Sequence, residues 1–448
     1  MKKLFGTDGI RGLANQYPMT IDMVQRLGSA AALFFKKRNK KTKIVIGKDT
    51  RLSNYMFETA LTSGINAMGV DVIWLGPLPT PAISHLTQSL RADAGIIISA
   101  SHNPYYDNGI KFFGPDGVKL GDAVEIQLEN LVLENKFNYS EIQYDKIGRL
   151  YRIDQGMGRY IEYLKNTFPK YLKLDGLRIG LDAANGAAYK IAPIVLEELG
   201  AEVFVIGDAP NGVNINEGVG ALHTKELRKL VIEHDLDIGI ALDGDADRVI
   251  FIDKMGNEVS GDAVLGVLAK ELMKNNKLKN KTLVTTVMSN MGLDKAIESI
   301  GGKIIKTKFG DRYVIEGLKK YEASFGGENS GHLIFQEYSK TGDGMLAALQ
   351  MLAILVKNDT SIDELVKFVK IYPQVLKSIP VRRKVPIDKI PEIKKRIDEI
   401  EKELGSTGRI FVRYSGTETK VRIMLEGDNY GKISDYADEL SEMFEKLV

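Results

Sequence analysis

Hydroxyl, imidazole and amine groups gather around one expected strand end near residue 100. Residues 95–98 form an apolar run typical of a short buried strand, and the dipeptide Asn103-Pro104 ends it. Open α/β sheets bind ligands at such strand ends. The polar side chains there are Ser99, Ser101 and His102, and Lys111 follows about ten residues later. A serine beside a base and a cation suits nucleophilic or phosphoryl chemistry, because its oxygen can carry the group while the others move protons and hold charge. A polar turn with a solvated lysine is the alternative for this stretch alone.

A second loop carries three carboxylates at alternate positions, followed by an arginine. Its residues are Asp243, Asp245, Asp247 and Arg248. The loop lies between the apolar segments 238–242 and 249–252, so its charges are costly unless a cation neutralises them. Oxygen-only ligands suit Mg²⁺ or Ca²⁺, but an EF-hand is excluded because its sixth and twelfth positions would be Arg248 and Lys254. We predict a metal site with Arg248 beside it for a phosphoryl oxygen, and the alternative is a solvated acidic turn.

Three further loops combine glycine with charged or hydroxyl side chains. The candidate ligands are Arg11 in residues 5–12; Glu328, Ser330 and His332 in residues 326–332; and Arg413, Ser415, Gly416, Thr417 and Arg422 around the turn 413–419. The alternating glycines of the first loop let the backbone fold closely around a phosphate that Arg11 could bind. The second loop suits vicinal sugar hydroxyls, and the third has the composition of an anion nest. Each loop alone could be an ordinary turn, and His332 could be a structural histidine. Residues 341–344 are expected to cap the helix that begins at Met345.

The composition excludes several classes of protein. The 448 residues include 61 basic and 59 acidic side chains, so the net charge of +2 gives no global field for nucleic acid or membranes. The absence of cysteine excludes disulfides, thiolate catalysis and cysteine metal sites. The N-terminal segment lacks the apolar core of a signal peptide, and the longest apolar helix, near residues 345–356, is shorter than the ~20 residues that a bilayer requires. We therefore expect a cytoplasmic protein with no nucleic-acid or membrane partner.

A strand, a helix, a glycine and a second strand recur three times along the chain. The copies span residues 41–76, 177–207 and 282–307, and each closes a parallel strand pair by a right-handed crossover. The last ~80 residues differ, because two alternating strands lie between amphipathic helices there. We therefore predict an α/β protein with three successive similar α/β domains, each built on a mixed sheet, and a smaller C-terminal α+β domain. The expected domains are residues 1–152, 153–254, 255–369 and 370–448.

Four of these loops, in this order, resemble the signature loops of the α-D-phosphohexomutase superfamily. The matching segments are Ser-Ala-Ser-His-Asn-Pro (99–104), Asp-Gly-Asp-Ala-Asp-Arg (243–248), Gly-Glu-Asn-Ser-Gly-His (327–332) and Arg-Tyr-Ser-Gly-Thr-Glu (413–418). The likeness covers the whole chain with one loop per domain, and the ordered set is far more specific than any single loop. Residues 5–12 and 287–292 are most similar to the bacterial phosphoglucosamine mutases of this superfamily. The resemblance implies that the four domains surround a central cleft.

The resemblance also implies a role for each loop. It selects Ser101 over Ser99 as the phosphoserine, and it assigns one Mg²⁺ per active site to Asp243, Asp245, Asp247 and the Ser101 phosphate. The candidates for proton transfer and charge stabilisation are Lys111, His102, Arg11 and Arg248. The sugar hydroxyls would be bound by Glu328, Ser330 and His332, and the phosphate that is not reacting by Arg413, Ser415, Gly416, Thr417 and Arg422.

The activity implied by the resemblance is the interconversion of glucosamine 6-phosphate and glucosamine 1-phosphate through a bisphosphorylated sugar. Such an isomerase would feed the synthesis of UDP-N-acetylglucosamine and cell-wall precursors. The expected activator is glucosamine or glucose 1,6-bisphosphate, the partner is a small hexosamine phosphate, and the assembly is a monomer or homodimer. Three alternatives stay open: a phosphomannomutase/phosphoglucomutase of the same superfamily, a phosphatase with Asp243 as nucleophile, and a non-enzymatic sugar-phosphate sensor.

Overall fold

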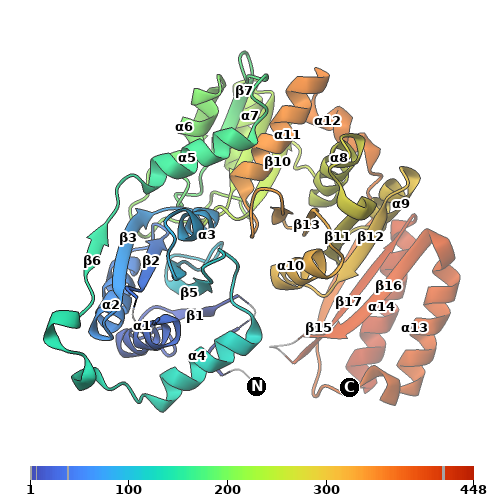
Figure 1. Ribbon diagram of the computed structural model, residues 1–448. Coiled ribbons are helices and arrows are strands. Elements are labelled where there is room, and N and C mark those ends of the chain that lie inside the picture. Colours follow the sequence, from blue (N-terminus) through green and yellow to red (C-terminus); the bar gives the residue numbers. More distant parts are fainter. Residues whose placement is uncertain (1–2, 7, 38–39, 416–418, 448) are drawn as a thin grey trace.

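Four units of secondary structure follow one another along an arc in the computed structural model, from the first in blue to the last in red (Figure 1). The structure describes residues 3–6, 8–37, 40–415 and 419–447. The units are built on sheets of six, four, four and three strands. The first and fourth units lie on either side of the opening of the arc (Figure 1).

The first unit surrounds a mixed sheet with the strand order β1-β5-β4-β2-β3-β6. Its strands are β1 (Ile10–Leu13), β2 (Lys43–Lys48), β3 (Asp71–Pro77), β4 (Ala94–Ile98), β5 (Asp107–Phe113) and β6 (Leu150–Arg152). Its helices are α1 (Ile21–Phe35), α2 (Asn54–Ala67), α3 (Thr80–Ser89) and α4 (Asp122–Glu134). Strand β5 pairs antiparallel with β4 and β1, whereas β2 pairs in parallel with β3 and β4. Strand β4 is buried along its whole length, as its apolar run predicts.

The second and third units each contain a mixed sheet of four strands. The second has the order β10-β9-β7-β8 and comprises α5 (Gly156–Thr167), β7 (Arg178–Asp182), α6 (Ile191–Glu198), β8 (Glu202–Ile206), α7 (Lys225–Glu233), β9 (Ile238–Leu242) and β10 (Val249–Asp253). The third has the order β12-β11-β13-β14 and comprises α8 (Gly261–Lys274), β11 (Thr282–Thr286), α9 (Met291–Ser299), β12 (Lys303–Thr307), α10 (Asp311–Lys320), β13 (Phe325–Gly327), β14 (Leu333–Phe335), α11 (Gly344–Asn358) and α12 (Ile362–Leu365).

The fourth unit is smaller and has an antiparallel sheet with the order β15-β17-β16. Its elements are β15 (Gln374–Pro380), α13 (Pro391–Leu404), β16 (Gly408–Tyr414), β17 (Lys420–Gly427) and α14 (Tyr430–Leu447). Both helices lie on the same side of the sheet in Figure 1. The predicted fold class, with three α/β units and a smaller α+β unit, is confirmed.

The three predicted strand–helix–strand repeats are also confirmed. Each forms a parallel pair, β2 with β3, β7 with β8 and β11 with β12. The predicted cap of α11 is present, because the Asp343 carboxylate accepts the backbone N–H of Leu346 at 3.0 Å. Among the described residues, no one helix combines the length and apolarity of a membrane span, and only the bent pair 344–358 and 362–368 meets both criteria together.

The hydrophobic core is shared unequally between the units. One continuous cluster joins the second and third units and includes side chains from one face of the first sheet. Helix α11 lies at its centre, is apolar on nearly all sides, and contacts α5, β9 and β10 of the second unit. The fourth unit has a separate cluster of its own. The first three units therefore form a common scaffold for the loops at their strand ends.

Candidate active site

The loop after β4 turns sharply and presents the hydroxyl of Ser101. Ser101 is buried and has a left-handed φ of 53°. Its Oγ lies 2.6 Å from Oδ2 of Asp243 and 3.3 Å from Nδ1 of His102. The Ser99 hydroxyl is used differently, because it donates to Oδ2 of Asp49 at 2.6 Å and accepts the backbone N–H of Ser101 at 2.9 Å. The geometry therefore brings Ser101, rather than Ser99, to the three aspartates.

A buried arginine fixes the backbone of this loop. The Arg51 guanidinium donates to the carbonyl oxygens of Ser101 (2.9 Å), Asn103 (2.8 Å), Asp107 (3.1 Å) and Pro104. Its Nε donates to Oδ2 of Asp49 at 2.9 Å, and neither side chain of this ion pair is exposed. The planar guanidinium group thus donates to four carbonyl groups and holds the loop that carries Ser101 in place. This structural role of Arg51 was not predicted from the sequence.

The three aspartates lie on the tight turn between β9 and β10, and each is buried. One carboxylate oxygen from each lies within 4.8 Å of the others. Oδ2 of Asp245 accepts from Thr80 Oγ1 at 2.6 Å, but Oδ1 of Asp245 and Oδ1 of Asp247 have no hydrogen-bond donor among the described residues. Burial and the two neighbouring carboxylates raise the pKa of Asp243 well above its ordinary value. Orphaned buried oxygens in a cluster of hard ligands fit a divalent cation such as Mg²⁺.

Lys111 on β5 lies between this turn and the N-terminal loop. Its Nζ is 3.0 Å from Oδ2 of Asp245, 3.0 Å from Oδ2 of Asp8 and 3.9 Å from Oδ2 of Asp247. Burial disfavours the ammonium, but the carboxylates of Asp245 and Asp8 outweigh it and raise the pKa of Lys111. The side chain is therefore a charged donor that can stabilise a phosphoryl oxygen.

The surroundings of His102 lower its pKa, whereas those of Lys111 raise the pKa of the lysine. Burial, together with the positive charges of Arg248 and Arg11, lowers its pKa to about 4. The imidazole is therefore neutral near pH 7 and able to accept a proton. It lies within hydrogen-bond reach of the Ser101 hydroxyl.

A cavity of about 300 Å³ lies between loops of the first three units. Its lining residues are Leu4, Gly6, Asp8, Gly9, Arg11, Asp247, Arg248, Phe309, Gly310, Asp311, Glu328 and His332. Five of the predicted site residues line it, and all carry cationic, acidic or imidazole groups: Arg11, Asp247, Arg248, Glu328 and His332. Because Asp247 is also part of the wall, the cavity opens directly onto the aspartate turn.

The loop between β13 and β14 supplies one wall of this cavity. Oε1 of Glu328 accepts the backbone N–H of Gly310 at 3.0 Å, and burial raises the pKa of this carboxyl. Nε2 of His332 accepts the backbone N–H of Gly342 at 3.1 Å, while Nδ1 lies 3.6 Å from Oδ1 of Asp247. The buried Oγ of Ser330 has no hydrogen-bond partner among the described residues. This loop can therefore offer both acceptor and donor groups to a polar ligand.

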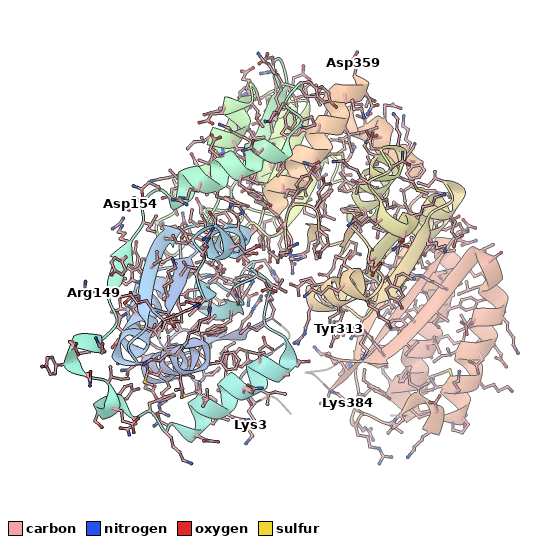
Figure 2. All side chains as sticks on the ribbon, viewed as in Figure 1. Lys3, Arg149, Asp154, Tyr313, Asp359 and Lys384 are labelled. Carbon is pink, nitrogen blue, oxygen red and sulfur yellow. The ribbon has the colours of Figure 1, made fainter. Side chains whose placement is uncertain are left out.

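The predicted phosphate loop of the fourth unit lies apart from this cavity. Arg413 and Arg422 are register partners on β16 and β17, and burial together with the neighbouring Arg422 lowers the pKa of Arg413. Both line a different cavity of about 280 Å³. The carbonyl oxygen of Ser415 accepts from Nζ of Lys384 at 2.7 Å, and Lys384 is at the end of the unit that faces the opening of the arc (Figure 2). Gly416 and Thr417 lie outside the described residues.

Three charged residues at the edge of the cavity between the first three units were not predicted from the sequence. Asp8, Lys119 and Asp311 connect to one another through ion pairs of 2.8 Å or less. Asp8 lies in the glycine-rich N-terminal loop, where only Arg11 had been singled out. Lys119 and Asp311 belong to no recognisable motif, so only tertiary packing reveals their link to the site.

A serine hydroxyl against a triad of buried carboxylates, with fixed cations around an adjoining polar cavity, defines the site of a phosphoryl-transfer enzyme. Four family models match the chain in order. They describe the phosphoglucomutase/phosphomannomutase alpha/beta/alpha domain I (residues 2–139), domain II (158–256), domain III (260–372) and C-terminal domain (376–443). The chain belongs to the phosphoglucomutase/phosphomannomutase family, and it is thus an enzyme of the phosphohexomutase class.

Relatives within this family match over the full length of the chain. The phosphoglucosamine mutase of Geobacter metallireducens is 54% identical over 448 residues, which is 100% of this chain and 99% of the relative. The phosphoglucosamine mutase of Geotalea uraniireducens is 53% identical with the same coverage. A solved phosphoglucomutase/phosphomannomutase family protein from Burkholderia thailandensis superposes with a TM-score of 0.81 at 22% identity, covering 98% of this chain and 96% of that one. The last comparison supports the fold.

Proposed function

We propose that the protein interconverts glucosamine 6-phosphate and glucosamine 1-phosphate through a phosphoserine at Ser101. The observation that carries the proposal is the position of the Ser101 hydroxyl, 2.6 Å from Asp243 and at the edge of the aspartate turn. The substrate follows from the full-length relatives, which are phosphoglucosamine mutases at more than half identity. The product would supply the synthesis of UDP-N-acetylglucosamine and cell-wall precursors.

The proposed reaction uses two phosphoryl transfers in opposite directions. In the first, the bond between phosphorus and Ser101 Oγ breaks, a bond to the free sugar hydroxyl forms, and the hydroxyl proton passes to a base. Ser101 regains a proton, and the sugar becomes a bisphosphate. After the bisphosphate turns around, the bond between its other phosphorus and the sugar oxygen breaks and a bond to Ser101 Oγ forms. The Ser101 proton passes to the base, and the sugar oxygen takes up a proton. Nδ1 of His102, 3.3 Å from Ser101 Oγ, is placed for the proton transfer, and Lys111, Arg11 and Arg248 suit the charge of the transferring group.

Asp243, Asp245 and Asp247 would hold one Mg²⁺ together with the Ser101 phosphate. The support is the pair of buried carboxylate oxygens without donors and the separation of the ligand atoms by no more than 4.8 Å. When bound, Mg²⁺ would neutralise phosphoryl oxygens and orient the group for in-line transfer. Arg248, whose Nε lies 3.8 Å from Oδ1 of Asp247, would bind a neighbouring phosphoryl oxygen.

The sugar and its second phosphate would be held from the third and fourth units. Glu328, Ser330 and His332 would bind the hydroxyl groups, and Arg413, Ser415, Gly416, Thr417 and Arg422 would bind the phosphate that is not reacting. Because the two arginines line a separate cavity, the fourth unit would have to swing toward Ser101 when substrate binds. We further propose that the protein works in the cytoplasm as a monomer or homodimer and that glucosamine or glucose 1,6-bisphosphate activates it.

The test measures the intact mass of the purified protein before and after incubation with glucose 1,6-bisphosphate. We expect the gain of one phosphoryl group in the wild type and in Ser99→Ala, mapped to Ser101, and no gain in Ser101→Ala. A Ser101→Ala variant that is still phosphorylated, or an acid-labile acyl phosphate on Asp243, would contradict the proposal. Competing glucosamine, glucose and mannose 6-phosphates in one coupled assay then tests the substrate, and preferred turnover of mannose or glucose phosphates would favour the phosphomannomutase/phosphoglucomutase alternative.

A further inference from the structure

A chain of buried charges connects the first and third units beside the cavity that Arg11, Arg248 and Glu328 line. Nζ of Lys119 donates to Oδ1 of Asp8 at 2.8 Å and to Oδ2 of Asp311, the first residue of α10. Each of the three side chains is at least four-fifths buried. Lys119 follows β5 in the first unit, and a backbone bridge between Phe113 and Lys119 fixes its position. Since Asp311 belongs to the third unit, Lys119 joins two units through one ammonium group.

The same chain reaches the proposed reaction centre through the other oxygen of Asp8. Oδ2 of Asp8 lies 3.0 Å from Nζ of Lys111, whose ammonium also contacts Asp245. The Asp8 carboxylate therefore joins three cations, with Lys111 and Arg11 on one oxygen and Lys119 on the other. A carboxylate with both oxygens engaged by fixed donors cannot rotate freely, so Lys119, together with Arg11, fixes the Asp8 oxygen that Lys111 contacts.

A second ion pair strengthens the junction at the neighbouring residue. Nη1 of Arg312 pairs with Oδ1 of Asp122 and lies 3.5 Å from Oε2 of Glu125, both on α4 of the first unit. Consecutive residues at the start of α10 thus contact two elements of the first unit. The preceding Gly310 donates its N–H to Glu328, so the loop between β13 and β14 is connected to the same junction.

We propose that Asp8, Lys119 and Asp311 are positioning residues that join the first and third units and hold the Lys111 ammonium against Asp245 of the aspartate turn. This role rests on the proposed mutase activity, in which Lys111 stabilises the transferring phosphoryl group. Lys119 and Asp311 act through Asp8: among the described residues neither forms a hydrogen bond or ion pair with Ser101 or with the aspartate turn. Asp311 also lies 3.8 Å from Nε2 of His332. Their loss should slow phosphoryl transfer while sugar binding is retained.

The experiment compares Lys119→Met, Lys119→Arg, Asp311→Asn and the double variant Lys119→Met/Asp311→Asn with the wild-type chain. The control is Lys357→Met, which removes an ion pair of similar length, 2.7 Å to Glu271, between α11 and α8. The measurements are kcat and KM with glucosamine 6-phosphate in the presence of glucose 1,6-bisphosphate. Hydrogen exchange of residues 119–125 and 310–316 is followed in parallel, because it reports the junction independently of turnover.

We expect Lys119→Met to lower kcat at least tenfold with KM within threefold of wild type, and Lys119→Arg to recover most of the loss. The double variant should be no slower than Lys119→Met, because both substitutions break the same link. Exchange should rise in both segments for Lys119→Met and Asp311→Asn but not for Lys357→Met. The proposal is overturned if Lys119→Met and Asp311→Asn each keep kcat within threefold, or if their effects multiply in the double variant.

Failure of the proposed function gives a different result. If the wild type turns over another hexose phosphate instead of glucosamine 6-phosphate, the same comparison on that sugar decides the positioning role. If the wild type turns over none, the mutase and the positioning role both fail. Unchanged exchange in both segments would then also overturn the link between the two units.

Discussion

Buried charge near Ser101 is divided between residues that satisfy one another and residues that do not. Arg51 and Asp49 are wholly buried and form a closed set of hydrogen bonds with the nucleophile loop. By contrast, Asp245 and Asp247 each keep one buried carboxylate oxygen that has no hydrogen-bond donor in the described part of the chain. An unsatisfied buried carboxylate is costly in the absence of a ligand, whereas a satisfied ion pair is costly only when one partner is removed. The first group is therefore structural, and the second is suited to binding a cation.

Replacing Arg51 with methionine should destabilise the first unit strongly. The substitution removes the only cation paired with the Asp49 carboxylate among the described residues and one donor from each of four loop carbonyl groups, and breaking a buried pair in this way costs ~3–5 kcal/mol. Urea unfolding followed by the fluorescence of Trp74, the single tryptophan, measures this loss within the same unit. Arg26→Met is the matched control, because its pair with Asp22 at 3.5 Å is partly exposed and is worth ~0–1 kcal/mol. Equal unfolding midpoints for the two variants would refute the structural role of Arg51.

At the scale of the elements, local patterns were predictable and long-range pairings were not. The strand–helix–strand repeats could be predicted because each is encoded within about 35 residues by apolar runs and by a glycine that follows the helix. Strands β1 and β6 were not predicted, because three- and four-residue strands gain their stability from partners far along the chain. The same division holds for the site: the motif loops were visible, whereas the link from Lys119 to Asp311 depends on packing between units.

The cap of α11 should make the stability of the protein depend on pH. Burial raises the pKa of Asp343 to about 6, above the ordinary value of 3.8, while Leu346 N–H and Tyr160 OH donate to the carboxyl. The folded state therefore holds the proton more tightly, and this group's contribution to the free energy of unfolding falls as pH rises from about 4 to about 6. The Asp343→Asn variant keeps an oxygen that can accept the Leu346 N–H, but its side chain does not titrate. Relative to the variant, the wild type should be more stable at pH 4.5 than at pH 7.5 by ~1–3 kcal/mol.

Urea unfolding at the two pH values measures this difference. Asp359→Asn is the control, because it removes the same charge at the exposed outer end of the same helix (Figure 2). If wild type and Asp343→Asn changed in parallel with pH, the cap would not be the titrating group.

Across the whole molecule, the units differ in how firmly they are attached. The second and third units share one hydrophobic cluster, whereas the fourth has its own core. A polar junction joins the fourth unit to the third. Glu426 on β17 is fully buried, accepts the backbone N–H of Met291 at 3.1 Å and pairs with Arg409 of β16. Arg409 also donates to carbonyl oxygens of the segment before α9. Such a junction allows the fourth unit to move as a body when the charged contact is released.

Arg409→Met should therefore loosen the fourth unit while the other three stay folded. The variant leaves a buried Glu426 carboxylate without its cation, which costs ~3–5 kcal/mol locally. Limited proteolysis should then cut faster within residues 370–373, the segment that leads into β15. Adding Glu426→Gln to Arg409→Met should slow the cleavage again, because it removes the unpaired charge. Arg396→Met is the control, since its ion pairs with Glu439 lie within the fourth unit and are partly exposed. Cleavage of Arg409→Met at the wild-type rate would mean that the Arg409 ion pair does not hold the fourth unit, and that the swing toward Ser101 does not depend on this charged junction.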